Sequence, residues 1–139
     1  MTNSQVFQTQ PGLFNTNSYL SSGIPFQTGS TIFSSSFGTD FGQSQVDFPY
    51  VAKSVTVINT SAVDLRVHFV SALSGSVVAG HHYTTLTDNK DSMTFTSKCR
   101  RIYISLATGS ANGSYELYAD LTNIPPYEMF PLTGSGLTV

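Results

Sequence analysis

Short segments in which apolar and polar residues alternate dominate the middle of this chain of 139 residues. Over Val63–Phe69 every second residue is apolar, which is the pattern of a strand with one buried face and one face in water. The same period of two recurs over Arg101–Ala107 and over Ser114–Leu121. No segment has the pattern of a convincing amphipathic helix. The chain is therefore predicted to be an all-β protein.

Further candidate strands are short, and they cover Val51–Asn59, Val77–Ala79, Tyr83–Thr87 and Ser92–Thr96. The turn residues Asp88–Asp91 separate the last two, which predicts a tight hairpin. About six to eight short strands at intervals of roughly 8–12 residues indicate a small antiparallel β-sandwich or a jelly-roll-like barrel. The predicted core consists of the inward residues of these strands: Val55, Val57, Val63, Leu65, Val67, Phe69, Leu86, Phe95, Ile102, Ile104, Leu106, Tyr115, Leu117, Ala119 and Leu121.

The first 49 residues differ in composition from this predicted sandwich. Twenty-nine of residues 1–48 are Ser, Thr, Asn, Gln or Gly, and Lys53 is the first basic residue of the chain. Such a composition is typical of a flexible linker, because it offers little apolar surface to offset chain entropy. However, seven of the ten Phe residues lie here, each separated from the next by polar or small residues.

We interpret residues 1–49 as a long, extended N-terminal arm that binds a neighbouring subunit. Two alternatives remain open, namely that the segment wraps around its own domain or that it is disordered. In the arm interpretation, single aromatic side chains act as anchors in pockets of the partner. The candidate anchors are Phe7, Phe14, Tyr19, Phe26, Phe33, Phe37 and Phe41. The remaining organisation is then a β-sandwich domain over 50–123 and an irregular Pro-rich tail over 124–139.

Charge and composition exclude several classes of function. Only 10% of the residues are charged, against roughly 25% in a typical soluble domain. The net charge of −2 argues against a nucleic-acid partner, since such surfaces are usually basic. No run approaches about 18 apolar residues, so we expect no membrane partner. The chain has no P-loop, G-x-S-x-G or G-x-G-x-x-G motif, and we therefore expect neither an enzyme nor a cofactor.

The histidines and the single cysteine are the other candidates for chemistry. His81 and His82 are adjacent, and neighbours on an extended segment point to opposite sides, so we expect no metal site even with His68 nearby. Cys99 lies within a basic run, where positive charge would lower the pKa of its thiol. A half-buried structural cysteine at the start of a strand is the interpretation that we adopt.

The run Lys98-Cys99-Arg100-Arg101 is the one basic patch in the sequence. No aromatic stacking platform for nucleic acid accompanies it, and the chain as a whole is acidic. Lys98, Arg100 and Arg101 are therefore a candidate contact patch for an acidic protein surface.

The stretch CRRIYISLATGSANGSYELYADLTNIPP, from Cys99 to Pro126, resembles terminal strands of phage structural proteins. Together with the polar N-terminal segment and the Pro-rich tail, it makes the chain similar to small virion-associated proteins of tailed phages and related viruses, which are decoration, cement or minor capsid proteins. The resemblance implies a β-sandwich that gathers around symmetry axes of a shell, often as a trimer, with arms that hold neighbouring capsid subunits.

The expected function is that of a non-enzymatic virion structural protein that binds and stabilises a capsid shell through its arm. Its expected partners are the major capsid protein or neighbouring virion subunits, together with further copies of itself. The resemblance implies a location on the capsid surface. Met1–Gln10 has no signal-peptide pattern, so we expect synthesis in the host cytoplasm. The alternative is a carbohydrate- or receptor-binding module of a viral fibre or adhesin, in which Tyr83, Tyr103 and Tyr118 would stack on sugars.

Overall fold

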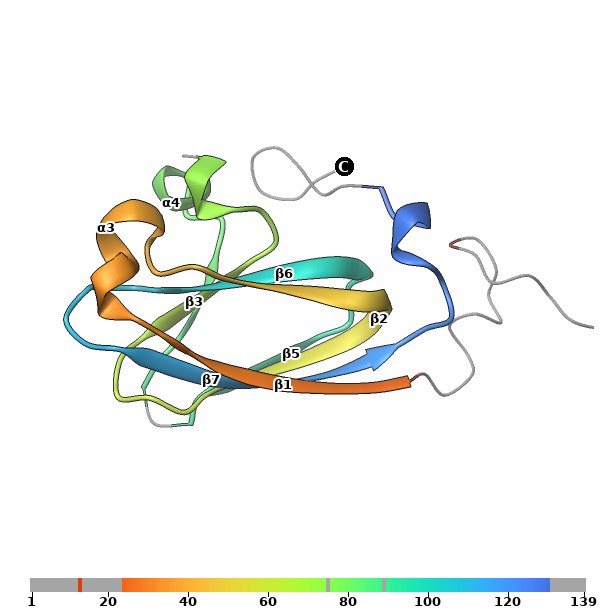
Figure 1. The fold of residues 1–139 in the computed structure, drawn as a ribbon, viewed down its shortest axis with the longest axis horizontal. Coiled ribbons are helices and arrows are strands. Elements are labelled where there is room, and N and C mark those ends of the chain that lie inside the picture. Colours follow the sequence, from red (N-terminus) through yellow and green to blue (C-terminus); the bar gives the residue numbers. More distant parts are fainter. Residues whose placement is uncertain (1–12, 14–23, 75, 89, 131–139) are drawn as a thin grey trace, which may run out of the picture.

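The computed structural model describes Leu13 and residues 24–74, 76–88 and 90–130. Its main feature is a seven-stranded antiparallel sheet that folds back on itself (Figure 1). The strands are β1 (Ile24–Ile32), β2 (Ser44–Asn59), β3 (Leu65–His68), β4 (Thr84–Leu86), β5 (Ser92–Phe95), β6 (Cys99–Leu106) and β7 (Gly113–Leu121). The prediction of an all-β, antiparallel fold of the sandwich type is confirmed.

The long strand β2 belongs to both layers of the sandwich. Its first residues, Ser44–Asp47, pair with β6, and β6 continues through β3 to β4. Its last residues, Ser54–Asn59, pair with β7, which continues to β1, while Val55–Ile58 also pair with β5 on the other side. One layer is therefore β1-β7-β2-β5, and the other is β2-β6-β3-β4 (Figure 1).

The change of layer takes place between Asp47 and Ser54. The register of β2 against β6 shifts between Asp47 and Ala52, and the register against β7 shifts between Ala52 and Ser54. Pro49 lies within this interval and has no N–H to donate to a ladder. Irregular pairing of this kind bends a strand and increases its twist. The bend lets one strand link two layers without a loop.

The space between the layers is filled by the residues that the alternation predicted. Of the predicted core, twelve members are buried, and Val63, Phe69 and Phe95 are half-buried against them. Residues from the region before Tyr50 complete this core, since Ile32, Val46 and Phe48 are buried in the same cluster. The core therefore draws on a longer part of the chain than residues 50–123.

The predicted arm is corrected over residues 24–49, because the sheet begins at Ile24 rather than at Tyr50. Strand β1 forms nine consecutive antiparallel pairs with β7, from Ile24 opposite Leu121 to Ile32 opposite Gly113. Its sequence hides this role, because a glycine and several polar residues interrupt the apolar alternation. Gly29 is required by packing, since a Cβ atom there would lie 2.8 Å from the Tyr115 carbonyl oxygen. Over residues 24–49 the chain therefore packs on its own domain, which was the alternative to an arm that binds a neighbouring subunit.

A short helical connection joins β1 to β2. It contains η1 (Ser34–Ser36) and α3 (Phe37–Asp40), and α3 ends where Phe41 and Gly42 adopt positive φ angles of 59° and 66°. The Phe41 carbonyl oxygen accepts a hydrogen bond from the Leu106 N–H at 2.9 Å, so the connection is attached to the end of β6.

The predicted strand over Val77–Ala79 is wrong, because these residues form the helical turn α4 (Ser76–Ala79). It follows η2 (Ala72–Ser74), and the two short helices contact each other. The run Val77–Ala79 is too short to form a stable strand pair, whereas one helical turn is enough to bury Val77. His81 ends the turn with a φ of 58°.

The predicted hairpin across Asp88–Asp91 is also wrong, because its two strands belong to different layers. β4 pairs with β3, and β5 pairs with β2. The connecting residues are held by the end of β2, where the Asn59 carbonyl oxygen accepts from the Lys90 N–H and the Asn59 N–H donates to the Asp91 carbonyl oxygen, both at 2.8 Å. The chain therefore crosses between layers here.

The start of the predicted tail packs against the domain. The Val51 N–H donates to the Ile124 carbonyl oxygen at 2.9 Å, and Val51, Ile124 and Met129 form a second buried cluster against which Leu13 packs. The short helix η3 (Pro126–Glu128) lies between Ile124 and Met129 in the chain. Residues 131–139 lie outside the described part of the chain. Within that part, no helix has the length and apolar character needed to cross a membrane.

Candidate functional site

The predicted basic patch lies at the start of β6. Lys98 is exposed just before the strand, whereas Arg100 and Arg101 are half-buried at its beginning. Cys99 between them is fully buried in the core, and burial raises the pKa of its thiol to about 12. Desolvation is the cause of this rise, and the thiol stays protonated near neutral pH. This agrees with the structural role expected for Cys99.

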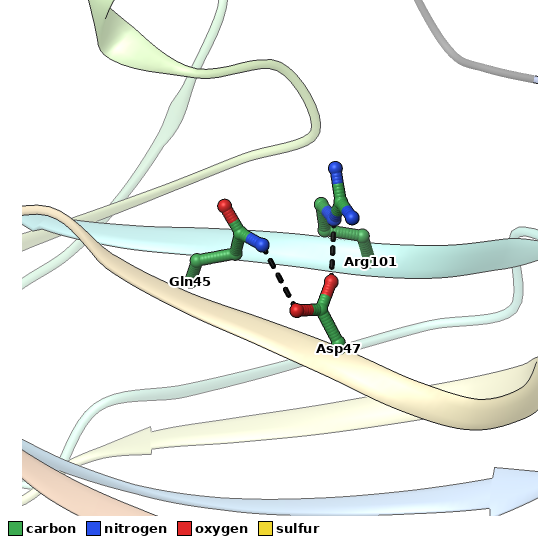
Figure 2. Close-up of polar contacts among 3 residues, drawn as sticks. All are labelled: Gln45, Asp47 and Arg101. Atoms are coloured by element: carbon green, nitrogen blue, oxygen red, sulfur yellow. Dashed lines mark hydrogen bonds and ion pairs between the residues drawn. The ribbon is translucent and has the colours of Figure 1, made fainter.

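Arg101 forms an ion pair with Asp47, its register partner on β2. The Arg101 Nε–H donates to Asp47 Oδ1 at 2.5 Å, and the Gln45 Nε2–H donates to Asp47 Oδ2 at 2.9 Å (Figure 2). Partial burial raises the pKa of the Asp47 carboxyl, but the hydrogen bonds from Arg101 and Gln45 outweigh it and hold the pKa below its usual value. One terminal nitrogen of the guanidinium points away from Asp47 (Figure 2).

Arg100 has no such partner. Among the residues that the structure describes, no carboxylate lies within ion-pair distance of its guanidinium. Asp47 is already paired with Arg101, and the charge of Arg100 lowers the pKa of the Asp47 carboxyl without an ion pair, so two guanidiniums at the start of β6 share one carboxylate. The patch therefore keeps a net capacity for an anionic partner.

The two arginines line a hollow of about 190 Å³ that the sequence did not reveal. Three segments that are far apart in the chain form its wall, and we call it the basic–aromatic hollow. Its lining residues are Phe69, Val70 and Ser71 after β3; Arg100, Arg101 and Tyr103 on β6; and Met129 and Phe130 after η3. Phe69, Met129 and Phe130 give it an apolar part, and the guanidiniums give it a cationic part. Such a mixture suits an acidic peptide segment that also carries an apolar side chain.

The segment after β3 is fixed by two side chains. The His68 ring bonds through Nδ1 to the Val70 carbonyl oxygen at 2.7 Å, and Gln43 accepts from the Ala72 N–H at 2.6 Å and donates to Ser71 Oγ at 3.0 Å. These contacts hold one wall of the basic–aromatic hollow in place before any partner arrives. A wall that is already ordered loses less entropy on binding.

His68 also joins this wall to β6. Its ring stacks on Tyr103 with an interplanar angle of 3°, and its Nε2 lies 2.9 Å from Ser105 Oγ. In the neutral ring, Nδ1–H donates to the carbonyl oxygen and Nε2 accepts from the Ser105 hydroxyl. Burial lowers the pKa of His68 and outweighs the hydrogen bond to Val70, which raises it, while the nearby charge of Arg66 lowers it further. Because His68 and Ser105 are each only 2% exposed, the pair acts as a structural contact.

The other wall is held by the tail. Met129 is buried against Val51 and Ile124, while Phe130 keeps 43% of its surface exposed beside the arginines. Opposite it, Phe69 packs edge to face on Phe95 with ring centroids 5.2 Å apart. The apolar part of the basic–aromatic hollow is thus attached to the core on both sides.

The predicted aromatic anchors do not share one environment. Phe26 and Phe37 pack against this chain's own core, with Phe26 edge to face on Phe48 and Phe37 edge to face on Phe41. Phe33 is 57% exposed and remains available to a partner. Phe7, Phe14 and Tyr19 lie outside the described residues. β1 and α3 place the half-buried Phe26 and Phe37 against the core of the domain, which they help to stabilise.

The three tyrosines of the carbohydrate alternative are also separated. Tyr103 is buried and stacks on His68, and Tyr83 lies under Arg66, whose Cζ atom is 4.3 Å from the ring centroid. Tyr118 is 39% exposed on β7, where its hydroxyl donates to Asp120 Oδ1 at 2.9 Å. These three rings therefore provide only one well-exposed stacking face.

The described residues contain no group of three or more His, Cys, Asp or Glu side chains placed to hold a metal ion. His81 is exposed, and His82 is half-buried. Both ring nitrogens of His68 are engaged with Val70 and Ser105.

No protein-family model matches this chain, and no curated protein has a significantly similar sequence. The function proposed below therefore depends on the geometry of the basic–aromatic hollow and on the pattern of the sequence.

Proposed function

We propose that this chain is a non-enzymatic virion structural protein that binds and stabilises a capsid shell as a decoration, cement or minor capsid protein. The observation that carries the proposal is the basic–aromatic hollow, in which Arg100 forms no ion pair with a described carboxylate and lies beside an apolar surface. A protein that binds a repeated surface needs such an ordered docking site and no chemistry of its own. The partner is an acidic segment of the major capsid protein, with an apolar side chain that contacts Phe130.

The two halves of the hollow contribute differently to binding. The guanidiniums attract the acidic partner and fix its orientation, and the apolar surface provides affinity that salt does not screen. A shell offers many identical sites, so a modest affinity at each one is sufficient when subunits also contact one another. Phe33 and the aromatic residues of the N-terminal segment supply additional contacts in this proposal.

The experiment measures co-sedimentation of the full chain with shells assembled from its cognate major capsid protein. Arg100→Glu reverses the charge of a residue that lines the hollow, and Lys90→Glu is the matched control, because it makes the same charge change on an exposed loop away from the hollow. We expect Arg100→Glu to weaken binding at least about tenfold, the loss typical of a charge-assisted contact of about 1.5–3 kcal/mol. Lys90→Glu is expected to bind as the unmodified chain does.

A second pair of variants tests the apolar half. Phe130→Ala removes the exposed ring that lines the hollow, whereas Tyr127→Ala removes a ring that is 81% exposed in the same segment but does not line it. Weaker shell binding by Phe130→Ala alone supports the proposal. Equal binding by Arg100→Glu, Phe130→Ala and their controls contradicts it.

The contribution of the N-terminal segment needs a separate deletion. Because β1 begins at Ile24, a deletion through residue 48 would remove a strand of the sheet and the start of β2. The informative deletion ends at Ser22. If this shortened chain binds shells with unchanged affinity, the arm has no role in docking.

A further inference from the structure

Strand β1 forms a long outer edge of the sheet. Its only strand neighbour is β7, and no hydrogen bond joins its backbone to any other segment in the described part of the chain (Figure 1). In an antiparallel ladder, alternate residues direct their N–H and C=O groups away from the neighbouring strand. The outer side of β1 therefore presents backbone groups that can pair with another strand.

This edge lacks most of the features that protect edge strands in monomeric proteins. Such strands are usually very short, irregular or charged. β1 is nine residues long, pairs with β7 without a register shift, and contains no charged residue. Pro25, near its start, is the one residue that removes a donor. The edges formed by β4 and β5 are much shorter, with three and four residues.

We propose that β1 pairs antiparallel with β1 of a second copy across a two-fold axis. A strand without charge is complementary to itself, since no like charges meet when the same strand faces it. Full overlap of Ile24–Ile32 places Thr28 opposite Thr28 of the partner subunit. It also places Ile24, which is 41% exposed, opposite Ile32 of the partner subunit, so that exposed apolar surface becomes covered at both ends.

The nearest acidic residues do not oppose this pairing. Glu116 and Asp120 lie on β7, opposite Gly29 and Pro25 of β1. In the pair, the two β7 strands are three strand spacings apart, roughly 14 Å. This exceeds the screening length of about 8 Å at physiological ionic strength, so their repulsion is weak. The proposed dimer has two-fold symmetry, whereas the resemblance to virion-associated proteins implies a trimer.

The test is sedimentation equilibrium of the full chain from about 1 to 500 µM, a range suited to the small interface of a strand pair. The mass is expected to rise with concentration from 15.0 kDa towards twice that value. The variant Gln27→Lys/Thr31→Lys places four lysines along the paired edges, at exposed positions of β1. This variant is expected to raise the dissociation constant of the dimer at least tenfold. The control Thr56→Lys/Ile58→Lys carries the same charges on the central strand β2 and is expected to associate as the unmodified chain does.

A cross-linking variant fixes the register and does not depend on charge. In Thr28→Cys the two thiols of the pair lie directly opposite each other, and mild oxidation is expected to give a covalent dimer. Cys99 is buried and does not compete, and Thr56→Cys is the matched control that is expected to stay monomeric.

Three results would overturn the proposal. The first is a mass of 15.0 kDa at every concentration. The second is association that the lysines on β1 leave unchanged, or that the lysines on β2 weaken equally. The third is association that depends on β1 without any Thr28→Cys cross-link, since another segment, such as residues 1–23, would then occupy the edge.

Discussion

Asn59 is a fully buried polar residue whose side chain makes five hydrogen-bond contacts, and its replacement provides a quantitative test. The side chain is fully buried at the end of β2. Its amide Nδ2 donates to the carbonyl oxygens of Val63, Leu86 and Thr87 at 2.8, 3.2 and 2.9 Å. Its Oδ1 accepts from the N–H and the hydroxyl of Ser61 at 2.9 and 2.7 Å. One side chain therefore joins β2 to the loop before β3 and to the end of β4.

The expected loss of stability follows from these contacts. The amide has two hydrogens, which the three carbonyl oxygens share, and two further hydrogen bonds end on Oδ1. At about 1 kcal/mol for each of four hydrogen bonds, Asn59→Ala is expected to lower the free energy of unfolding by about 3–4 kcal/mol. This is a large fraction of the roughly 5–15 kcal/mol typical of a domain. Asn59→Asp keeps the acceptor but loses the donors, and we expect it to be at least as destabilising.

The assay is equilibrium unfolding in urea, followed by circular dichroism and tyrosine fluorescence because the chain has no tryptophan. The control is Asn112→Ala, which removes an exposed side chain with a single hydrogen bond from the Ser34 N–H at 2.8 Å. It is expected to cost less than about 1 kcal/mol. A loss below about 1 kcal/mol for Asn59→Ala would refute the idea that this side chain holds the layers together.

Three other properties follow from the buried residues. Gly113→Ala is expected to cost about 1–3 kcal/mol in urea unfolding, because the new Cβ would lie 2.7 Å from side-chain atoms of Leu106 and Leu65, whereas Gly38→Ala, with no atom within 4 Å, is expected to be tolerated. In the folded chain the pKa of His68 lies below 6.5, its usual value in an unfolded chain, so the unfolded state binds more protons. The urea concentration at the unfolding midpoint is therefore expected to fall as the pH drops below about 6.5. His68→Gln is expected to flatten this part of the profile, and an unchanged slope would contradict the assignment. Cys99, with a thiol pKa of about 12 and no exposed surface, is expected to resist a thiol reagent at pH 8 in the folded chain and to react fully in urea; rapid labelling of the folded chain would show that the site is open.

Sequence reasoning was most successful where the pattern is local. The alternation over Val63–Phe69, Arg101–Ala107 and Ser114–Leu121 predicted β3, β6 and β7 and the faces that they bury. A period of two can be recognised from neighbouring residues alone, so such a strand can be predicted without knowing its partner strand.

The features that sequence reasoning missed depend on partners far away in the chain. β1 is held by β7, and its Gly29 is explained only by the Tyr115 backbone beside it. Likewise, Asp88–Asp91 has the composition of a hairpin turn, yet the pairing of β4 and β5 with different strands makes it a crossing between layers.

The candidate site was visible only in part. The basic run predicted Arg100 and Arg101, because consecutive charges are a local signal. Phe69 and Phe130 come from segments that meet only in the fold, so no spacing in the sequence connects them to the arginines. The unequal burial of Phe26 and Phe33 could not be predicted for the same reason.

We propose above all that this chain is a structural component of a virion. Its most direct test is the copy number of the chain, relative to the major capsid protein, measured by quantitative mass spectrometry of purified particles. For a virion component, we expect a ratio that is fixed by the symmetry of the shell and constant from one preparation to the next. Absence of the chain from purified particles, or a ratio that varies between preparations, would contradict it.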